Sequence, residues 1–114
     1  MRTLDQIKLA DNDRAALQEV AAALRAKLQI DKIILFGSKA RGDGREDSDA
    51  DLLILTSRTL TGEERDLMIH EIFQNELQRG LMISPMIVPA IEWNEGVYIA
   101  MLLHSEVDRD GVLV

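Results

Sequence analysis

The stretch that decides the fold reads Ile33-Ile-Leu-Phe-Gly-Ser-Lys-Ala-Arg-Gly-Asp-Gly-Arg-Glu-Asp-Ser-Asp-Ala-Asp-Leu-Leu-Ile-Leu-Thr56. Two apolar runs, residues 33–36 and 52–55, flank a polar loop. Neither run alternates apolar with polar residues, so each is predicted to be a strand covered on both faces of a sheet, the second beginning at about Asp49. The loop is too short for a helical crossover, and we therefore expect the two strands to run antiparallel.

A helix is predicted on each side of this stretch. The first is expected to be capped by Asp11 or Asn12 and carries an apolar stripe at helical spacing: Leu17, Val20, Ala21, Leu24 and Leu28. The second starts at Thr61, which fits a capping box with Glu64, and stops at Gly80. Its expected apolar face consists of Leu67, Ile69, Ile72, Phe73 and Leu77.

The last third of the chain adds a strand and a helix. Residues 81–88 are predicted to form a third strand, either at an edge of the sheet or with a bulge, because Pro85 donates no hydrogen bond to a neighbouring strand. One long helix is expected from Glu92 to His104, followed by a short strand over residues 112–114. This order predicts an α+β fold for residues 1–114: a single domain in which helices pack on a mixed sheet.

Composition narrows the class of protein. The chain has 114 residues, 46% hydrophobic and 29% charged, which is ordinary for a globular protein. Its net charge of −7 disfavours binding to a nucleic-acid backbone. The absence of cysteine excludes disulfides and thiolate zinc sites. Neither a signal-peptide pattern nor an apolar run of membrane-spanning length is present, so the expectation is a cytoplasmic protein with no membrane partner.

Two carboxylates open the second predicted strand. Side chains alternate along a strand, so Asp49 and Asp51 point to the same face, roughly 7 Å apart. Left alone they would repel each other, and a divalent cation between them would remove that repulsion. Oxygen ligands suit Mg²⁺, which typically takes one or two carboxylates together with substrate phosphates. The pair is therefore a candidate metal site, and the alternative is a pair of solvated residues at a strand start.

The end of the first predicted strand offers the other half of a site. Glycine at position 37 lets a phosphate approach the backbone closely. Ser38 offers a hydroxyl and begins a short helix, whose first N–H groups favour an anion. Lys39, Arg41 and Arg45 are nearby cations that could neutralise phosphate charge. The expected chemistry is metal-assisted phosphoryl or nucleotidyl transfer. The alternative interpretation of Gly37-Ser38 is an ordinary turn with no role in binding.

Together these residues resemble a known signature. Gly37-Ser38, ten intervening residues and Asp49-Ala50-Asp51 look like the motif of the DNA polymerase beta-type nucleotidyltransferase superfamily. The longer strings Leu-Phe-Gly-Ser-Lys-Ala-Arg-Gly and Ser-Asp-Ala-Asp-Leu resemble its minimal, single-domain branch. The resemblance implies the nucleotidyltransferase fold, with Asp49 and Asp51 as catalytic metal ligands. It also implies that Gly37, Ser38 and Arg41 hold a nucleoside triphosphate, ATP, in the presence of Mg²⁺.

The same branch suggests a partner. Many minimal members are antitoxins of an all-helical HEPN-domain toxin, and some attach AMP to that toxin. The resemblance therefore implies a HEPN-domain protein as the acceptor of AMP. Apolar residues in the last third of this chain also leave a homo-oligomer open.

One departure from the family pattern leaves an alternative open. Active members generally add a third carboxylate from a later strand, and residues 81–88 contain neither Asp nor Glu. Ser84 stands about where that carboxylate is expected, and Glu92 or Glu95 could replace it only if the following loop folds back. The alternative function is therefore a catalytically impaired binding module that neutralises a helical partner by contact.

Overall fold

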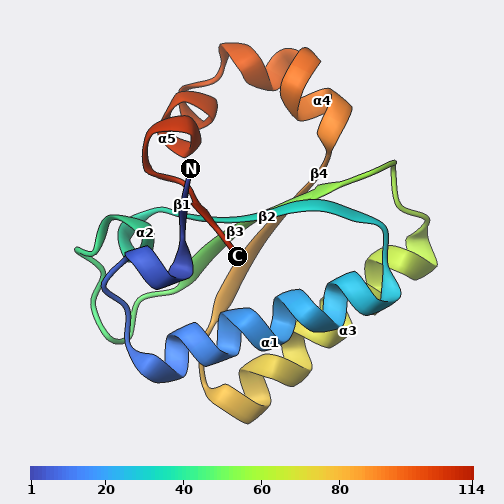
Figure 1. The fold of residues 1–114 in the computed structure, drawn as a ribbon. Helices are drawn as coiled ribbons and strands as arrows, with labels where there is room; N and C mark the ends of the chain where they lie inside the picture. The colour runs from blue at the N-terminus through green and yellow to red at the C-terminus, as the bar shows by residue number, and fades with distance from the viewer.

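Five strands form one mixed sheet in the computed structural model, which describes residues 1–114 (Figure 1). The strands are β1 (Arg2–Thr3), β2 (Ile30–Phe36), β3 (Ala50–Thr56), β4 (Ile83–Pro89) and β5 (Val112–Leu113), in the spatial order β1-β5-β2-β3-β4. β2 runs antiparallel to both β3 and β5, whereas β4 is parallel to β3 and β1 is parallel to β5. The predicted α+β class, the antiparallel central pair and the edge position of β4 are confirmed.

Helices cover both faces of this sheet (Figure 1). The long helices α1 (Asp11–Lys27) and α3 (Gly62–Arg79) lie side by side on one face. The opposite face carries the short helices α4 (Ala90–Glu95) and α5 (Leu102–Asp110), joined by a 3₁₀ turn, η2 (Val97–Ala100). Two further short helices are η1 (Leu4–Gln6) and α2 (Ser38–Arg41). None of the helices combines the length and apolar composition needed to cross a bilayer.

The central strand β3 is buried on both faces, as its unbroken apolar run predicts. Leu52 and Ile54 belong to the larger core cluster, beneath α1 and α3. Leu53 and Leu55 belong to a smaller cluster that also contains Trp93 of α4. All four leucine and isoleucine side chains are essentially inaccessible to solvent. The site residues at the start of β3 are therefore attached to the most deeply buried strand of the sheet.

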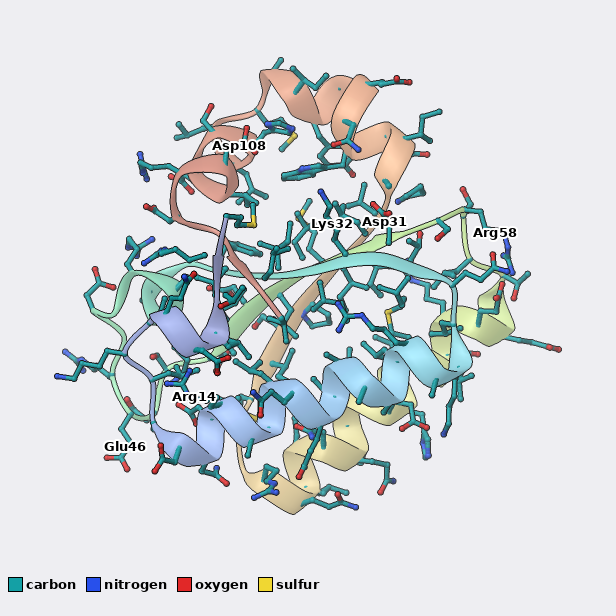
Figure 2. All side chains as sticks on the ribbon, viewed as in Figure 1. Arg14, Asp31, Lys32, Glu46, Arg58 and Asp108 are labelled. Atoms are coloured by element: carbon teal, nitrogen blue, oxygen red, sulfur yellow. The ribbon has the colours of Figure 1, made fainter.

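The start of α1 is held to the segment before it. The stripe from Leu17 to Leu28 is buried as predicted, but the helix cap is Ala10, with Asp11 as the first helical residue. The guanidinium of Arg14 donates to the backbone carbonyls of Leu4, Ile7 and Leu9 (Figure 2). One side chain thus fixes the entry of the chain into α1.

The apolar face predicted for α3 is largely wrong. Ile72 is buried and Leu67 is half-buried, but Ile69, Phe73 and Leu77 are 47%, 52% and 66% exposed. The buried face instead consists of Met68, Ile72 and Asn75, which recur at helical spacing toward the sheet and α1. Apolar residues occur on several sides of this helix, and the positions that pack against α1 determine which side is buried.

The long C-terminal helix expected from Glu92 to His104 is also wrong. Gly96 adopts an extended backbone (φ −95°, ψ −161°) and ends α4, and the chain continues as η2 and α5. Glycine is a poor residue for a helix interior because it loses the most conformational freedom there. Trp93 stacks on His104 across the break, with ring centroids 4.7 Å apart, so the three short pieces fold over one aromatic residue.

The capping box of α3 generates a pH prediction. Glu64 accepts hydrogen bonds from the Arg58 guanidinium and the Thr61 backbone N–H, which lower the pKa of its carboxyl from 4.5 to about 2. A lowered folded-state pKa stabilises the fold above the unfolded value, and the gain is lost as pH falls through the folded value. Glu64→Gln is therefore expected to be less stable than wild type at pH 6, with the difference vanishing between about pH 4.5 and about pH 2.

Urea denaturation at several pH values measures this difference. Glu63→Gln is the matched control, because Glu63 is the adjacent residue of the same first turn and forms no ion pair. A stability difference that stays constant from pH 6 to pH 2 for Glu64→Gln would contradict the assignment.

Candidate active site

Strand pairing brings the predicted site residues to one end of the sheet. Phe36, the last residue of β2, lies opposite Asp51 in β3, so Gly37 follows immediately beside that carboxylate. On the other side of β3, Asp51 lies opposite Ser84 in β4. The end of β2 and the beginnings of β3 and β4 therefore meet. Gly37 directly follows β2, Asp51 lies in β3 and Ser84 lies in β4.

Gly37 makes the closest approach at this end of the sheet. Its backbone (φ +77°, ψ −158°) lies in a region that essentially only glycine occupies. A Cβ atom added there would lie 2.3 Å from Asp51 Oδ2, closer than any real contact. The turn therefore requires glycine both for its backbone conformation and for the space that the Asp51 carboxylate fills.

Asp49 and Asp51 share the face of the sheet that α4 and α5 partly cover. Asp49 is exposed and Asp51 is half-buried, whereas Ala50 between them is fully buried on the other face. Burial raises the pKa of the Asp51 carboxyl, the neighbouring charge of Asp49 raises it further, and the charge of Arg41 lowers it. The two carboxylates thus repel each other, and a bound cation would relieve that repulsion.

Ser84 completes the cluster without adding a third carboxylate. Its hydroxyl donates a hydrogen bond of 3.2 Å to Asp49 Oδ2, so it lies beside the pair, as the sequence predicts. The structure contains no group of three or more Asp, Glu, His or Cys residues able to hold a metal ion together. Glu92 and Glu95 are exposed residues of α4 and do not supply the missing carboxylate.

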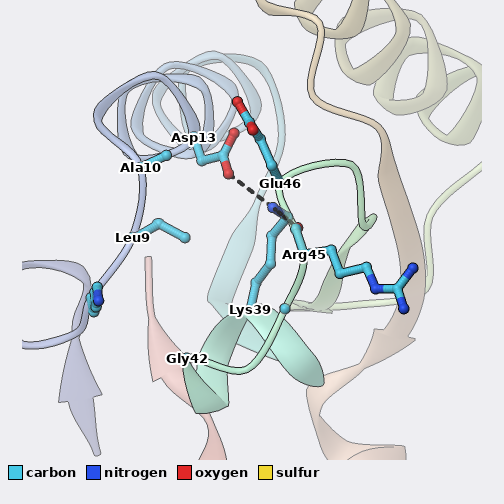
Figure 3. Close-up of a pocket in the computed structure, with 9 residues that line it drawn as sticks. Leu9, Ala10, Asp13, Lys39, Gly42, Arg45 and Glu46 are labelled. Carbon is cyan, nitrogen blue, oxygen red and sulfur yellow. Dashed lines mark hydrogen bonds and ion pairs between the residues drawn. The ribbon is translucent and has the colours of Figure 1, made fainter.

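The three candidate cations are placed differently. Arg41 is 42% exposed, its Nε lies 3.4 Å from Asp43 Oδ2, and its charge acts on Asp51. Lys39 is buried and donates to Asp13 Oδ2 at 2.9 Å, so its amine faces a carboxylate in this structure (Figure 3). The Arg45 side chain extends away from Lys39 into solvent. Asp13 was not anticipated as a partner, because 26 residues separate it from Lys39 and no local pattern links them.

Comparison with known proteins identifies the family. The model of the nucleotidyltransferase domain matches residues 17–100, which include Gly37, Ser38, Arg41, Asp49, Asp51 and Ser84. The chain belongs to the nucleotidyltransferase domain family. A candidate protein adenylyltransferase of Methanocaldococcus jannaschii is 40% identical over 70 residues, which are 61% of this chain and 69% of that protein. A second candidate protein adenylyltransferase of the same organism is 52% identical over 46 residues, 39% of this chain and 46% of its own length.

Solved structures of the family share the fold. A minimal nucleotidyltransferase matches with a TM-score of 0.59 and 23% identity, over 95% of this chain and all 100% of that one. A chain of a toxin–antitoxin complex with AMP-PNP matches with a TM-score of 0.59 and 17% identity, over 91% of this chain and 72% of that one. A chain from a complex of a tri-AMPylated Shewanella oneidensis HEPN toxin with MNT antitoxin gives a TM-score of 0.50 at 18% identity, over 90% and 67%. At these identities the likeness concerns the nucleotidyltransferase fold.

The contact between Gly37 and Asp51 predicts an unequal response of three glycines to alanine. Gly37, Gly42 and Gly80 all have φ between +76° and +80°, but only at Gly37 does an added Cβ meet another atom within 4 Å. Gly80→Ala is expected to cost about 1–2 kcal/mol of stability, the ordinary cost of a left-handed backbone. Gly37→Ala is expected to cost roughly 1–3 kcal/mol more, since its backbone region is nearly closed to other residues and Asp51 must move.

Urea denaturation of the two variants and of Gly42→Ala tests this expectation. If Gly37→Ala is no more harmful than the two controls, the close approach to Asp51 does not exist in solution.

Proposed function

We propose that this nucleotidyltransferase-family chain binds ATP with Mg²⁺ and transfers AMP to a partner protein. The observation that carries the proposal is the contact between the Gly37 turn and the Asp51 carboxylate. A triphosphate held at Gly37 and Ser38 would lie directly beside the two carboxylates. The relative that is 40% identical and described as a candidate protein adenylyltransferase supports AMP as the group transferred and a protein as its acceptor.

The residues at the strand ends fit a magnesium ion. Asp49 and Asp51 would hold it, and a cation would relieve both the burial of the Asp51 charge and its repulsion by Asp49, which together raise the pKa of Asp51. Two carboxylates without a third side-chain ligand suit an ion that takes its remaining oxygens from phosphates and water. When bound, Mg²⁺ neutralises phosphate charge and polarises the phosphorus that is attacked.

The chain's own residues then have distinct tasks. Gly37 lets the triphosphate-binding turn approach the Asp51 carboxylate closely, and Ser38 offers a hydroxyl and a backbone N–H at the start of α2. Arg41 is exposed and held only by Asp43, so its guanidinium is free to turn toward a phosphate and pair with it bidentately. Ser84 cannot act as a general base at neutral pH, so it does not perform the role of the missing carboxylate.

The partner is proposed to be a helical HEPN-domain protein, with this chain as its antitoxin. Two of the solved structures that share the fold come from toxin–antitoxin complexes, one containing AMP-PNP and one containing an AMPylated HEPN toxin. Those ligands and partners belong to those proteins. They support the same kind of partner here because the fold and the strand-end carboxylates are in place.

A transfer assay tests the catalytic proposal. The chain is incubated with Mg²⁺, ATP labelled on the α-phosphate and the HEPN-domain protein encoded by a neighbouring gene. Label is expected on the HEPN protein with wild type and to fall by roughly a hundredfold or more with Asp49→Asn or Asp51→Asn, since both carboxylates are needed for the metal. Asp47→Asn is the matched control, because Asp47 is an exposed loop residue two positions before Asp49. Equal labelling by all four proteins, or none by wild type, would refute the proposal.

The alternative function is neutralisation by contact alone, and the hydroxyl of Ser84 in place of a carboxylate favours it. Substitution of this residue separates the two functions. Ser84→Asp adds a carboxylate beside Asp49, so Mn²⁺ affinity and the transfer rate are each expected to rise roughly tenfold or more. Ser84→Asn is the matched control of similar size without charge.

Calorimetric titration with Mn²⁺ and the same transfer assay provide the readouts. If Ser84→Asp behaves like Ser84→Asn in both, while Asp49→Ala/Asp51→Ala still neutralises the partner, contact alone is the function.

A further inference from the structure

Lys39 is an unusual residue in this site because its charge is buried. Its side chain is only 5% exposed. Lysine is almost never fully buried unless a partner pairs with its charge. The amine donates to Asp13 Oδ2 at 2.9 Å and to the backbone carbonyl of Arg45 at 3.4 Å. The Asp13 side chain is itself only 13% exposed, so both members of the ion pair are withdrawn from water.

The carbonyl of Arg45 connects this ion pair to the loop before Asp49. Besides the Lys39 amine, it accepts hydrogen bonds from Ser48 N at 3.1 Å and from Ser48 Oγ at 2.6 Å. Ser48 directly precedes Asp49. The position of the first carboxylate is therefore linked to the Lys39 amine through a single backbone carbonyl and one residue.

The backbone of α2 holds the other end of the same loop. The carbonyl of Ser38 accepts from the N–H groups of Asp43 and Gly44, both at 3.1 Å. A Cβ added at Gly44 would lie 3.1 Å from both the backbone nitrogen and Cγ of Lys39, so the loop packs directly on the lysine stem. Ser38 and Lys39 thus anchor the loop, while Asp13 anchors Lys39 to the first turn of α1 (Figure 3).

We propose that the buried Lys39–Asp13 ion pair positions the Gly37–Ser38 turn against Asp49 and Asp51, and that Lys39 does not itself contact the nucleotide. Lys39 is thereby a positioning residue, in contrast to Arg41. Both members of the ion pair line a cavity of about 490 Å³, together with Lys8, Arg45 and Glu46 among others. The competing interpretation is that the Lys39 amine leaves Asp13 and binds a phosphate in this cavity. The inference rests on the proposed nucleotide site for its functional part.

Removal of one or both charges separates the two roles. Breaking a buried pair leaves an uncompensated charge, whereas removing both partners is often nearly neutral. Lys39→Met and Asp13→Ala alone are each expected to weaken binding of a non-hydrolysable ATP analogue with Mg²⁺ by roughly tenfold to a hundredfold, because misplacement of a site by about 1 Å has that effect. The double variant is expected to recover to within a few-fold of wild type. A phosphate-binding lysine predicts that the double variant stays as weak as Lys39→Met, and that result would overturn the proposal.

Amide hydrogen exchange in the absence of nucleotide gives a second readout. The N–H groups of Asp43, Gly44 and Ser48 are expected to exchange faster in either single variant and to return toward wild-type rates in the double variant. Lys27→Met is the matched control, because Lys27 forms a partly exposed ion pair with Glu71 between α1 and α3 and should leave these amides unchanged.

The two readouts distinguish failure of this inference from failure of the proposed function. If wild type binds no nucleotide but the exchange pattern is as expected, the ion pair organises the loop and the proposed function fails. If the loop amides do not respond to loss of Lys39 or Asp13, the positioning role fails whatever the nucleotide affinity.

Discussion

The register between β2 and β3 is the constraint on which the site depends. It sets Phe36 opposite Asp51 and so places Gly37 against the carboxylate. A slip of one residue would turn every β3 side chain to the other face of the sheet. Apolar clusters cover both faces of this strand. Its leucines and isoleucine would therefore stay buried after such a slip, and they add little to its free-energy cost. The carboxylates make the slip costly, because Asp51 would move into the position of fully buried Ala50 and its charge would be buried. The residues proposed to bind metal thus also determine how the strand is aligned.

Much of the fold is readable from local patterns. The apolar runs at 33–36 and 52–55, the stripe of α1 and the Thr61–Glu64 capping box are all signals contained within one element, and each is confirmed. The predictions that are wrong concern which face of a helix packs on its neighbours and where a helix ends. Which side of α3 is buried depends on where α1 lies, and periodicity cannot resolve this when apolar residues occur on several sides. Gly96 is a local signal of a broken helix, but the apolar residues around it recur at helical spacing and favour a continuous one.

The candidate site likewise contains residues that local sequence predicts and one ion pair that it does not. Gly37, Ser38, Asp49 and Asp51 lie within one stretch, so their spacing and strand alternation predict that they meet. The position of Ser84 beside Asp49 follows from the pairing of β4 with β3 and was also predicted. The ion pair of Lys39 with Asp13 could not be predicted, because it joins α2 to the first turn of α1, 26 residues earlier, and depends on a loop conformation with no sequence period. Lysine after Gly-Ser suggests a phosphate ligand until its burial is known.

The arrangement of the two shortest strands has a consequence for biosynthesis. β1 is joined to the sheet only through β5, which lies between β1 and β2, so Arg2 pairs with Val112. During translation β1 therefore has no partner until residues 112–113 have been made, and the edge of β2 that pairs with β5 stays open for the same period. Contacts so distant in sequence form late and slowly, and an unpaired strand edge is a template for association with other chains. The sheet is completed only by residues that lie about 110 positions after its first strand.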